Sequence, residues 1–148
     1  MFRVNSMPIY TTYLGYLNKH RDAPQQLGSC FVYYVMRNRG NNEVAPNKEM
    51  LEAFMKVKKI YVSKDEQEEF WKQYEENYLI QIGLSKEAKT WMEKRSQEAK
   101  IGNILLVCFE KDATRCHRRL LAEEIKRRFG AEYKGELNLF FLLGVSLA

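Results

Sequence analysis

The chain reads Asn-Ile-Leu-Leu-Val-Cys-Phe-Glu-Lys-Asp-Ala-Thr-Arg-Cys-His-Arg-Arg-Leu-Leu-Ala-Glu-Glu-Ile from Asn103 to Ile125. Residues 103–109 are a largely apolar run, which is typical of a buried strand. A short polar turn follows, and apolar residues then recur at helical spacing over residues 114–129. The stretch therefore predicts a strand, a turn and a helix, which is the repeating unit of an α/β fold.

Strand and helix patterns also alternate along the rest of the chain. Strands are expected at 9–14, 31–36, 59–63 and 137–145, and helices at 48–57, 63–78 and 85–100. The continuous apolar run 31–36 favours a central strand covered on both faces. Residues 16–29 predict a loop with one helical turn. We therefore expect a single α/β domain, residues 1–148, with a mostly parallel β-sheet of about four to five strands flanked by helices.

Capping residues indicate where the expected helices begin and end. Asn47 and Ser85 each precede a helical pattern, and Ser63 with Glu66 fits a capping box. Gly130 follows the last periodic residue of the C-terminal helix and is expected to end it. These signals support the helix assignments independently of hydrophobic periodicity.

Composition narrows the class of protein. The formal net charge of +5 favours an anionic partner, either a small molecule or a nucleic acid. The three cysteines form no Cys-x-x-Cys pair, which disfavours a zinc ribbon and suggests reduced thiols in the cytoplasm. No run reaches the roughly 18 apolar residues of a membrane span, and the N-terminus lacks the apolar core of a signal peptide. We expect a cytoplasmic protein with no membrane partner. The sequence indicates neither a cofactor nor an oligomeric state.

Candidate site residues gather where the strand 103–109 passes into the following helix. Cys108 lies near the end of the strand and Cys116 at the start of the helix, so the turn between them can bring the two thiols together. A helix N-terminus offers free N–H groups to an anion. His117, Arg118 and Arg119 follow Cys116 directly, so this junction predicts an anion-binding site.

Each residue type at the junction suggests a role. Cys116 is the candidate nucleophile, and Glu110 and His117 are the candidate proton carriers. The candidate substrate-binding residues are Arg37, Arg118, Arg119 and Cys108. Neighbouring helix positions diverge by about 100°, so at most one of the two adjacent arginines is expected to line the pocket, and the other can pair with a glutamate. The alternative is that both cysteines are core residues and His117 is a capping or surface residue.

Three familiar phosphate-binding motifs do not fit. A tyrosine-phosphatase loop needs a thiol and an arginine closer together in sequence than Cys108 and Arg115, and its loop lacks carboxylates such as Glu110 and Asp112. Asp112 or Thr114 is instead expected to cap the helix. The Gly-Lys-Ser/Thr of a Walker loop and the glycine fingerprint of a dinucleotide-binding turn are absent.

The junction resembles the family called domain of unknown function 488, or DUF488. Its hallmark is a hydrophobic strand, Cys-x-Glu-Lys-Asp, and then Cys-His-Arg followed by Leu-Leu-Ala. This chain has Cys108-Phe-Glu-Lys-Asp and Cys116-His-Arg-Arg-Leu-Leu-Ala122. Weaker similarities are Ile9-Tyr-Thr, Arg37 after an apolar strand, and Pro46-Asn-Lys-Glu-Met-Leu. Many members have Asp-Val-Arg where this chain has Val-Met-Arg37. The resemblance implies an α/β fold and the location of the site, and names no reaction.

Three functions follow from these observations. The leading hypothesis is a small cytosolic enzyme that binds a phosphate-bearing substrate, a nucleotide or nucleic-acid component, at the junction. The first alternative is a non-catalytic nucleic-acid-binding module, because residues 111–128 hold seven basic and three acidic residues. The second is a redox or metal protein that uses Cys108, Cys116 and His117. A fourth metal ligand would then come from His20, Cys30 or Glu110.

Overall fold

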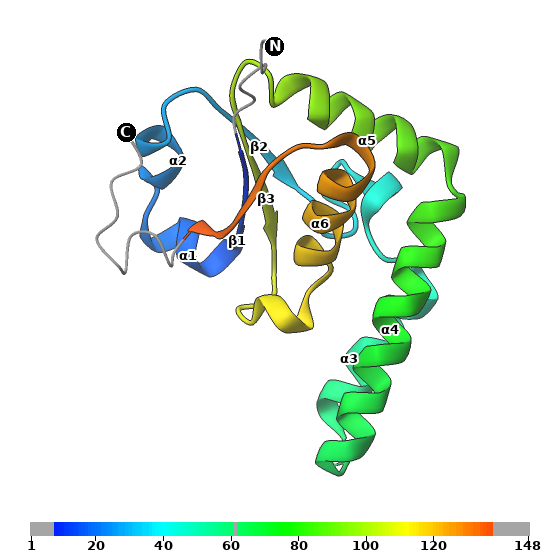
Figure 1. The fold of residues 1–148 in the computed structure, drawn as a ribbon. Coiled ribbons are helices and arrows are strands. Elements are labelled where there is room, and N and C mark those ends of the chain that lie inside the picture. The colour runs from blue at the N-terminus through cyan, green and yellow to red at the C-terminus, as the bar shows by residue number, and fades with distance from the viewer. Residues whose placement is uncertain (1–7, 61, 138–148) are drawn as a thin grey trace.

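A computed structural model describes residues 8–60 and 62–137, and its centre is a sheet of four parallel strands (Figure 1). The strands are β1 (Ile9–Tyr13), β2 (Cys30–Tyr34), β3 (Asn103–Cys108) and β4 (Tyr133–Glu136). Their order across the sheet is β2-β3-β1-β4, and every neighbouring pair is parallel. The structure confirms the expected α/β fold, with four strands in the described residues.

The helices cover both faces of this sheet. They are α1 (Leu14–Lys19), α2 (Ala23–Gln26), α3 (Lys48–Lys59), α4 (Lys64–Leu84), α5 (Lys86–Glu98) and α6 (His117–Phe129). Leu17 of α1 and Ala23 of α2 pack on one face, and α5 and α6 contribute Met92 and Leu121 to the core on the other. Figure 1 shows α3 and the first part of α4 extending side by side away from the sheet. None of the helices within residues 8–60 and 62–137 is both long enough and apolar enough to cross a membrane.

Strand β3 shows how the alternation of side chains along a strand places Cys108 in the site. Ile104, Leu106 and Cys108 belong to the core on the α5–α6 face, whereas Leu105 and Val107 belong to the core on the α1–α2 face. Successive side chains of a strand point to opposite faces. Because Cys108 is the last residue of β3, its thiol lies on the α6 face, at the edge of the sheet where α6 begins.

The predicted caps are confirmed. The side chains of Asn47, Ser63 and Ser85 accept hydrogen bonds from the backbone N–H groups of Met50, Glu66 and Ala88 respectively. Ser63 also donates to the Glu66 carboxylate, at 2.9 Å, which completes the capping box. Gly130 ends α6 with φ +77°, a left-handed conformation that favours glycine.

Two strand predictions are corrected. The described residues of the expected strand 59–63 form no strand: Lys59 ends α3, and Ser63 is the N-cap of α4. The run 31–36 is not central, since β2 lies at an edge of the sheet. Its side chains are nevertheless apolar because helices cover both faces, with Phe31 packed on one core and Val32 on the other.

The remaining differences concern element ends. The expected strand 137–145 lies outside the described residues except for Leu137, and β4 precedes it. The helix expected to end near residue 78 continues to Leu84, because Ile82 extends its buried face. The C-terminal helix begins at His117 rather than at residue 114. Asp112 accepts the Thr114 N–H and forms a separate 3-10 turn, Ala113–Arg115, before an extended Cys116.

Candidate functional site

A pocket of about 300 Å³ lies beyond the carboxyl ends of β2 and β3. Ligands of open α/β sheets bind at this edge, where the strands pass into loops. Cys108, Cys116 and His117 line the pocket and are each no more than 5% exposed. Other walls come from α3 and α4, which contribute Phe54 and Tyr74. The predicted junction is therefore the buried end of an apolar pocket.

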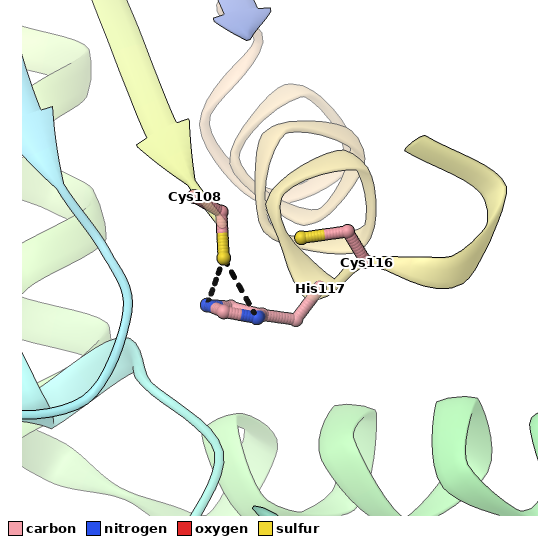
Figure 2. Close-up of side chains that lie close together, drawn as sticks. All are labelled: Cys108, Cys116 and His117. Carbon is pink, nitrogen blue, oxygen red and sulfur yellow. Dashed lines mark hydrogen bonds between the residues drawn. The ribbon is translucent and has the colours of Figure 1, made fainter. Parts of the chain in front are cut away.

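The two cysteines and His117 form one cluster (Figure 2). Cys108 Sγ lies 3.6 Å from His117 Nδ1 and 3.9 Å from Nε2. His117 Nε2 lies 2.8 Å from the backbone oxygen of Val35. A carbonyl oxygen only accepts, so Nε2 carries a proton, and the Cys108 sulfur lies over the ring at similar distances from both nitrogens. Figure 2 also shows Cys116 pointing toward Cys108, so the turn brings both thiols and the imidazole together as expected.

The surroundings of Cys116 favour its thiolate. Burial opposes ionisation, but hydrogen bonds with Cys108 and His117 and the positive charges of His117 and Arg118 lower the pKa of Cys116 well below its ordinary value. The hydrogen bond to Cys116 and burial raise the pKa of Cys108 well above its ordinary value. The hydrogen bond between the two sulfurs therefore favours the thiol form of Cys108 and the thiolate form of Cys116. Cys116 also occupies the N-cap position of α6, where the first backbone N–H groups are free.

Arg118 points away from the pocket and is completely buried. Its Nε and Nη2 donate to the two carboxylate oxygens of Glu136, at 3.1 and 2.6 Å. It also donates to the backbone oxygens of Glu110 and Lys111. These contacts use nearly all of its N–H groups. Arg118 therefore connects the β3–α6 loop to β4 and supplies a buried positive charge near Cys116.

Arg119 does not line the pocket either. Its guanidinium donates to Glu75 of α4 at 2.7 Å and to Glu123, one turn along α6, at 3.3 Å. The helix geometry allowed at most one of the two adjacent arginines to face the pocket, and in the structure both pair with carboxylates. Neither is positioned in the structure to hold an anion beside Cys116.

Arg37 is the predicted anion-binding residue that does line the pocket. It follows β2 and is half-buried. Within residues 8–60 and 62–137 it has no hydrogen-bond or ion-pair partner among those the structure shows. Arg115 also lines the pocket, but it pairs with Glu68 at 3.3 Å. Arg37 is thus the guanidinium that remains available to a ligand.

The two carboxylates of the turn have separate surroundings. Glu110 lines the pocket and accepts a hydrogen bond from Lys58 Nζ at 2.9 Å. Asp112 lies outside the pocket lining and accepts from the backbone N–H and hydroxyl of Thr114, as expected for a capping residue. These hydrogen bonds lower the pKa of Asp112. Glu110 is therefore the carboxylate of the turn that lies at the pocket.

Sequence patterns did not identify Tyr74 and Arg115 as site residues. Tyr74 belongs to an apolar helical stripe, which predicts a core position, and Arg115 precedes the motif. In the structure the Tyr74 ring lines the pocket, and burial, together with the nearby negative charges of Cys116 and Glu110, raises its pKa. Both residues become recognisable only when α4 packs over the strand ends, because Tyr74 belongs to α4 and Arg115 pairs with Glu68 of α4.

A parallel α/β sheet with this Cys-x-Glu-Lys-Asp loop and Cys-His-Arg helix start defines a recognisable class of domain. The chain belongs to the DUF488 family: the model of the active DUF488-N3 subclade, DUF488-N3a, matches residues 34–129, more than half of the chain. The matched region contains every residue that lines the pocket. No match was found among curated proteins or among solved structures. The family resemblance carried by the motif is confirmed.

Proposed function

We propose that this protein is an enzyme that binds a small phosphate-bearing substrate, a nucleotide or a nucleic-acid component, in the pocket beside Cys116. The observation that carries the proposal is Arg37. A half-buried guanidinium without a protein partner loses hydration that an anionic ligand can replace. Arg37 lines the same pocket as Cys116 and His117, so a bound phosphate would place the rest of the ligand near the thiols.

The other walls of the pocket suit a planar apolar group. Phe54, Met36 and Leu51 line it together with the Tyr74 ring. Small-molecule sites combine such apolar walls with a few polar groups that fix orientation. A nucleobase offers an aromatic face to these side chains. The phosphate of the nucleotide offers a negative charge that can pair with the Arg37 guanidinium. This combination supports a nucleotide over an inorganic anion.

The proposed chemistry uses Cys116 as the nucleophile. Its sulfur would form a bond to an electrophilic atom of the substrate, and the bond to the leaving group would break with its electron pair. Glu110 lines the pocket and is more exposed than His117, so it would carry the proton to the leaving group. Water would then release the substrate fragment and regenerate the thiolate. His117 and Cys108 orient and stabilise the Cys116 sulfur.

The basic segment 111–128 gives less support to a non-catalytic nucleic-acid-binding module. Its arginines pair with carboxylates in the structure: these are Arg115, Arg118, Arg119, Arg127 and Arg128. A phosphate backbone binds to free positive charge, and an arginine that already has a carboxylate partner contributes less. The local excess of basic residues is therefore largely neutralised within the fold.

Calorimetric titration with nucleoside mono-, di- and triphosphates, and with inorganic phosphate, tests the proposal. Arg37→Met is expected to weaken nucleotide binding by about ten- to a hundredfold, the range for one charge-assisted hydrogen-bonding group. Arg21→Met, at an exposed position between α1 and α2, is the matched control and should bind normally. Equal affinities of the Arg37 variant and the wild type, or no binding by the wild type, would contradict the proposal.

The catalytic part needs a separate comparison. Cys116→Ser should keep the nucleotide affinity within a few fold, since the serine retains the size of the side chain, and should lose covalent capture of the substrate. Intact-protein mass spectrometry after acid quench measures that capture. Substrate-derived mass on the Cys116→Ser variant would rule out Cys116 as the nucleophile.

A further inference from the structure

We propose that Cys108, Cys116 and His117 also form a Zn²⁺ site with three protein ligands and a fourth position that faces the pocket. This inference goes beyond the proposed reaction and does not depend on it. Two thiolates and an imidazole are a ligand set that zinc prefers over harder cations. Sites with three protein ligands keep one position for water or substrate.

The spacing of the donor atoms fits a tetrahedral ion. The sulfur atoms and a ring nitrogen of His117 all lie within 4.8 Å of one another, and Cys108 Sγ lies 3.6 Å from Nδ1. With Zn–S near 2.3 Å and Zn–N near 2.0–2.1 Å, a tetrahedral site has an S–N edge of about 3.5 Å and an S–S edge of about 3.8 Å. The length of the Cys108–His117 edge therefore matches, and the ring has to turn so that Nδ1 points at the ion, because Cys108 Sγ lies over the ring and is 3.9 Å from Nε2.

The second hydrogen bond of His117 supports the same assignment. Histidines that bind a metal through one ring nitrogen usually donate the other N–H to a carbonyl or carboxylate. The Val35 oxygen accepts from His117 Nε2 at 2.8 Å, which leaves Nδ1, after loss of any proton, as the nitrogen that can bind the ion. The contact comes from the residue directly after β2, so the scaffold itself sets the tautomer.

The described part of the chain supplies no fourth side-chain ligand. Among residues 8–60 and 62–137, no other histidine, cysteine or carboxylate joins this group. Cys30 is the first residue of β2, at the end of that strand opposite to the pocket. His20 follows α1, where its ring stacks on Tyr16. The three ligands line the pocket, so the open position faces the ligand-binding space.

Metal binding would make Cys116 less reactive. Each sulfur would share one electron pair with Zn²⁺, and any thiol proton would pass to the solvent on binding. The sulfur keeps further electron pairs, but the ion withdraws charge from it and blocks access to it. We therefore expect the thiols to be protected in the metal-bound form.

Anaerobic titration of the full chain with Co²⁺, a spectroscopic substitute for Zn²⁺, tests the site. One equivalent should produce the thiolate-to-cobalt charge-transfer band and the intense visible bands of four-coordinate cobalt, and one equivalent of Zn²⁺ should abolish them. Cys108→Ser, Cys116→Ser and His117→Ala should each weaken binding by more than about tenfold. Cys30→Ser is the matched control and should titrate like the wild type.

A measurement on the wild type avoids the risk that a buried variant misfolds. Zn²⁺ should slow iodoacetamide labelling of Cys108 and Cys116 at least tenfold and leave Cys30 unchanged. Weak cobalt bands typical of six-coordinate ions, or equal protection of all three cysteines, would overturn the inference. Arg37→Met should keep the cobalt spectrum while losing nucleotide affinity, so failure of the metal site and failure of the proposed function give different results.

Discussion

The buried ion pair between Arg118 and Glu136 is expected to contribute more to stability than any surface pair of the chain. The Arg118 side chain is 0% exposed and that of Glu136 is 12% exposed. Glu136 also accepts from Thr11 of β1. Replacing Arg118 by Met leaves a buried carboxylate without its cation, and replacing Glu136 by Leu leaves a buried guanidinium without its anion.

Loss of one partner of a buried pair costs about 3–5 kcal/mol, because the remaining charge is desolvated and unpaired. In a domain of this size 1 kcal/mol corresponds to roughly 2–4 °C, so each single variant should melt about 6–20 °C lower. The double variant Arg118→Met/Glu136→Leu leaves neither charge buried. It should therefore be destabilised by less than the sum of the two single variants.

Urea unfolding of the wild type, both single variants and the double variant measures the coupling free energy. Lys134→Ala is the matched control, because Lys134 lies in β4 like Glu136. Lys134 pairs with Glu132 at 3.1 Å, and both side chains are about half exposed. That pair should contribute no more than about 1 kcal/mol. Single variants of Arg118 and Glu136 within 1 kcal/mol of wild type would refute the structural role assigned to Arg118.

Three further outcomes follow from the structure. Gly102→Ala should cost about 1–3 kcal/mol in urea unfolding, because its Cβ would lie 2.9 Å from the Phe31 ring. Ser85→Ala should cost about 1 kcal/mol, because the Ala88 N–H loses its capping acceptor. Burial raises the pKa of Tyr133 from 10.0 to about 12. The neutral Tyr133 side chain therefore makes its full contribution to the free energy of unfolding below pH 10, and this contribution is lost as the pH rises toward 12. Tyr133→Phe should accordingly flatten the fall in unfolding free energy between about pH 9 and 11.5.

The core of the site was predictable because local patterns determine it. Alternation along β3 decides that Cys108 points toward α6, and the short turn returns the chain to the same edge of the sheet. Cys116 and His117 then begin the helix beside that thiol. No long-range contact is needed to bring these three side chains together, and the capping residues of the helices are equally local.

The rest of the pocket depends on long-range packing. Helices α3 and α4 bring Phe54 and Tyr74 over the strand ends, and an apolar helical stripe looks the same whether it lines a pocket or a core. The direction of Arg118 depends on Glu136 of β4, which no helical spacing relates to it. The sequence could not show that β2 lies at an edge of the sheet, because an edge strand covered by helices is as apolar as a central one.

Differential alkylation of the metal-free protein tests the central claim most directly, namely that Cys116 is a reactive thiolate in a ligand-binding pocket. Burial raises the pKa of Cys30 to about 11, whereas the surroundings of Cys116 lower its pKa. Iodoacetamide at neutral pH, followed by peptide mass spectrometry, should therefore label the buried Cys116 before the more exposed Cys30. A nucleotide should protect Cys116 in the wild type and fail to protect it in Arg37→Met. Faster labelling of Cys30, with no effect of nucleotide on Cys116, would contradict the account.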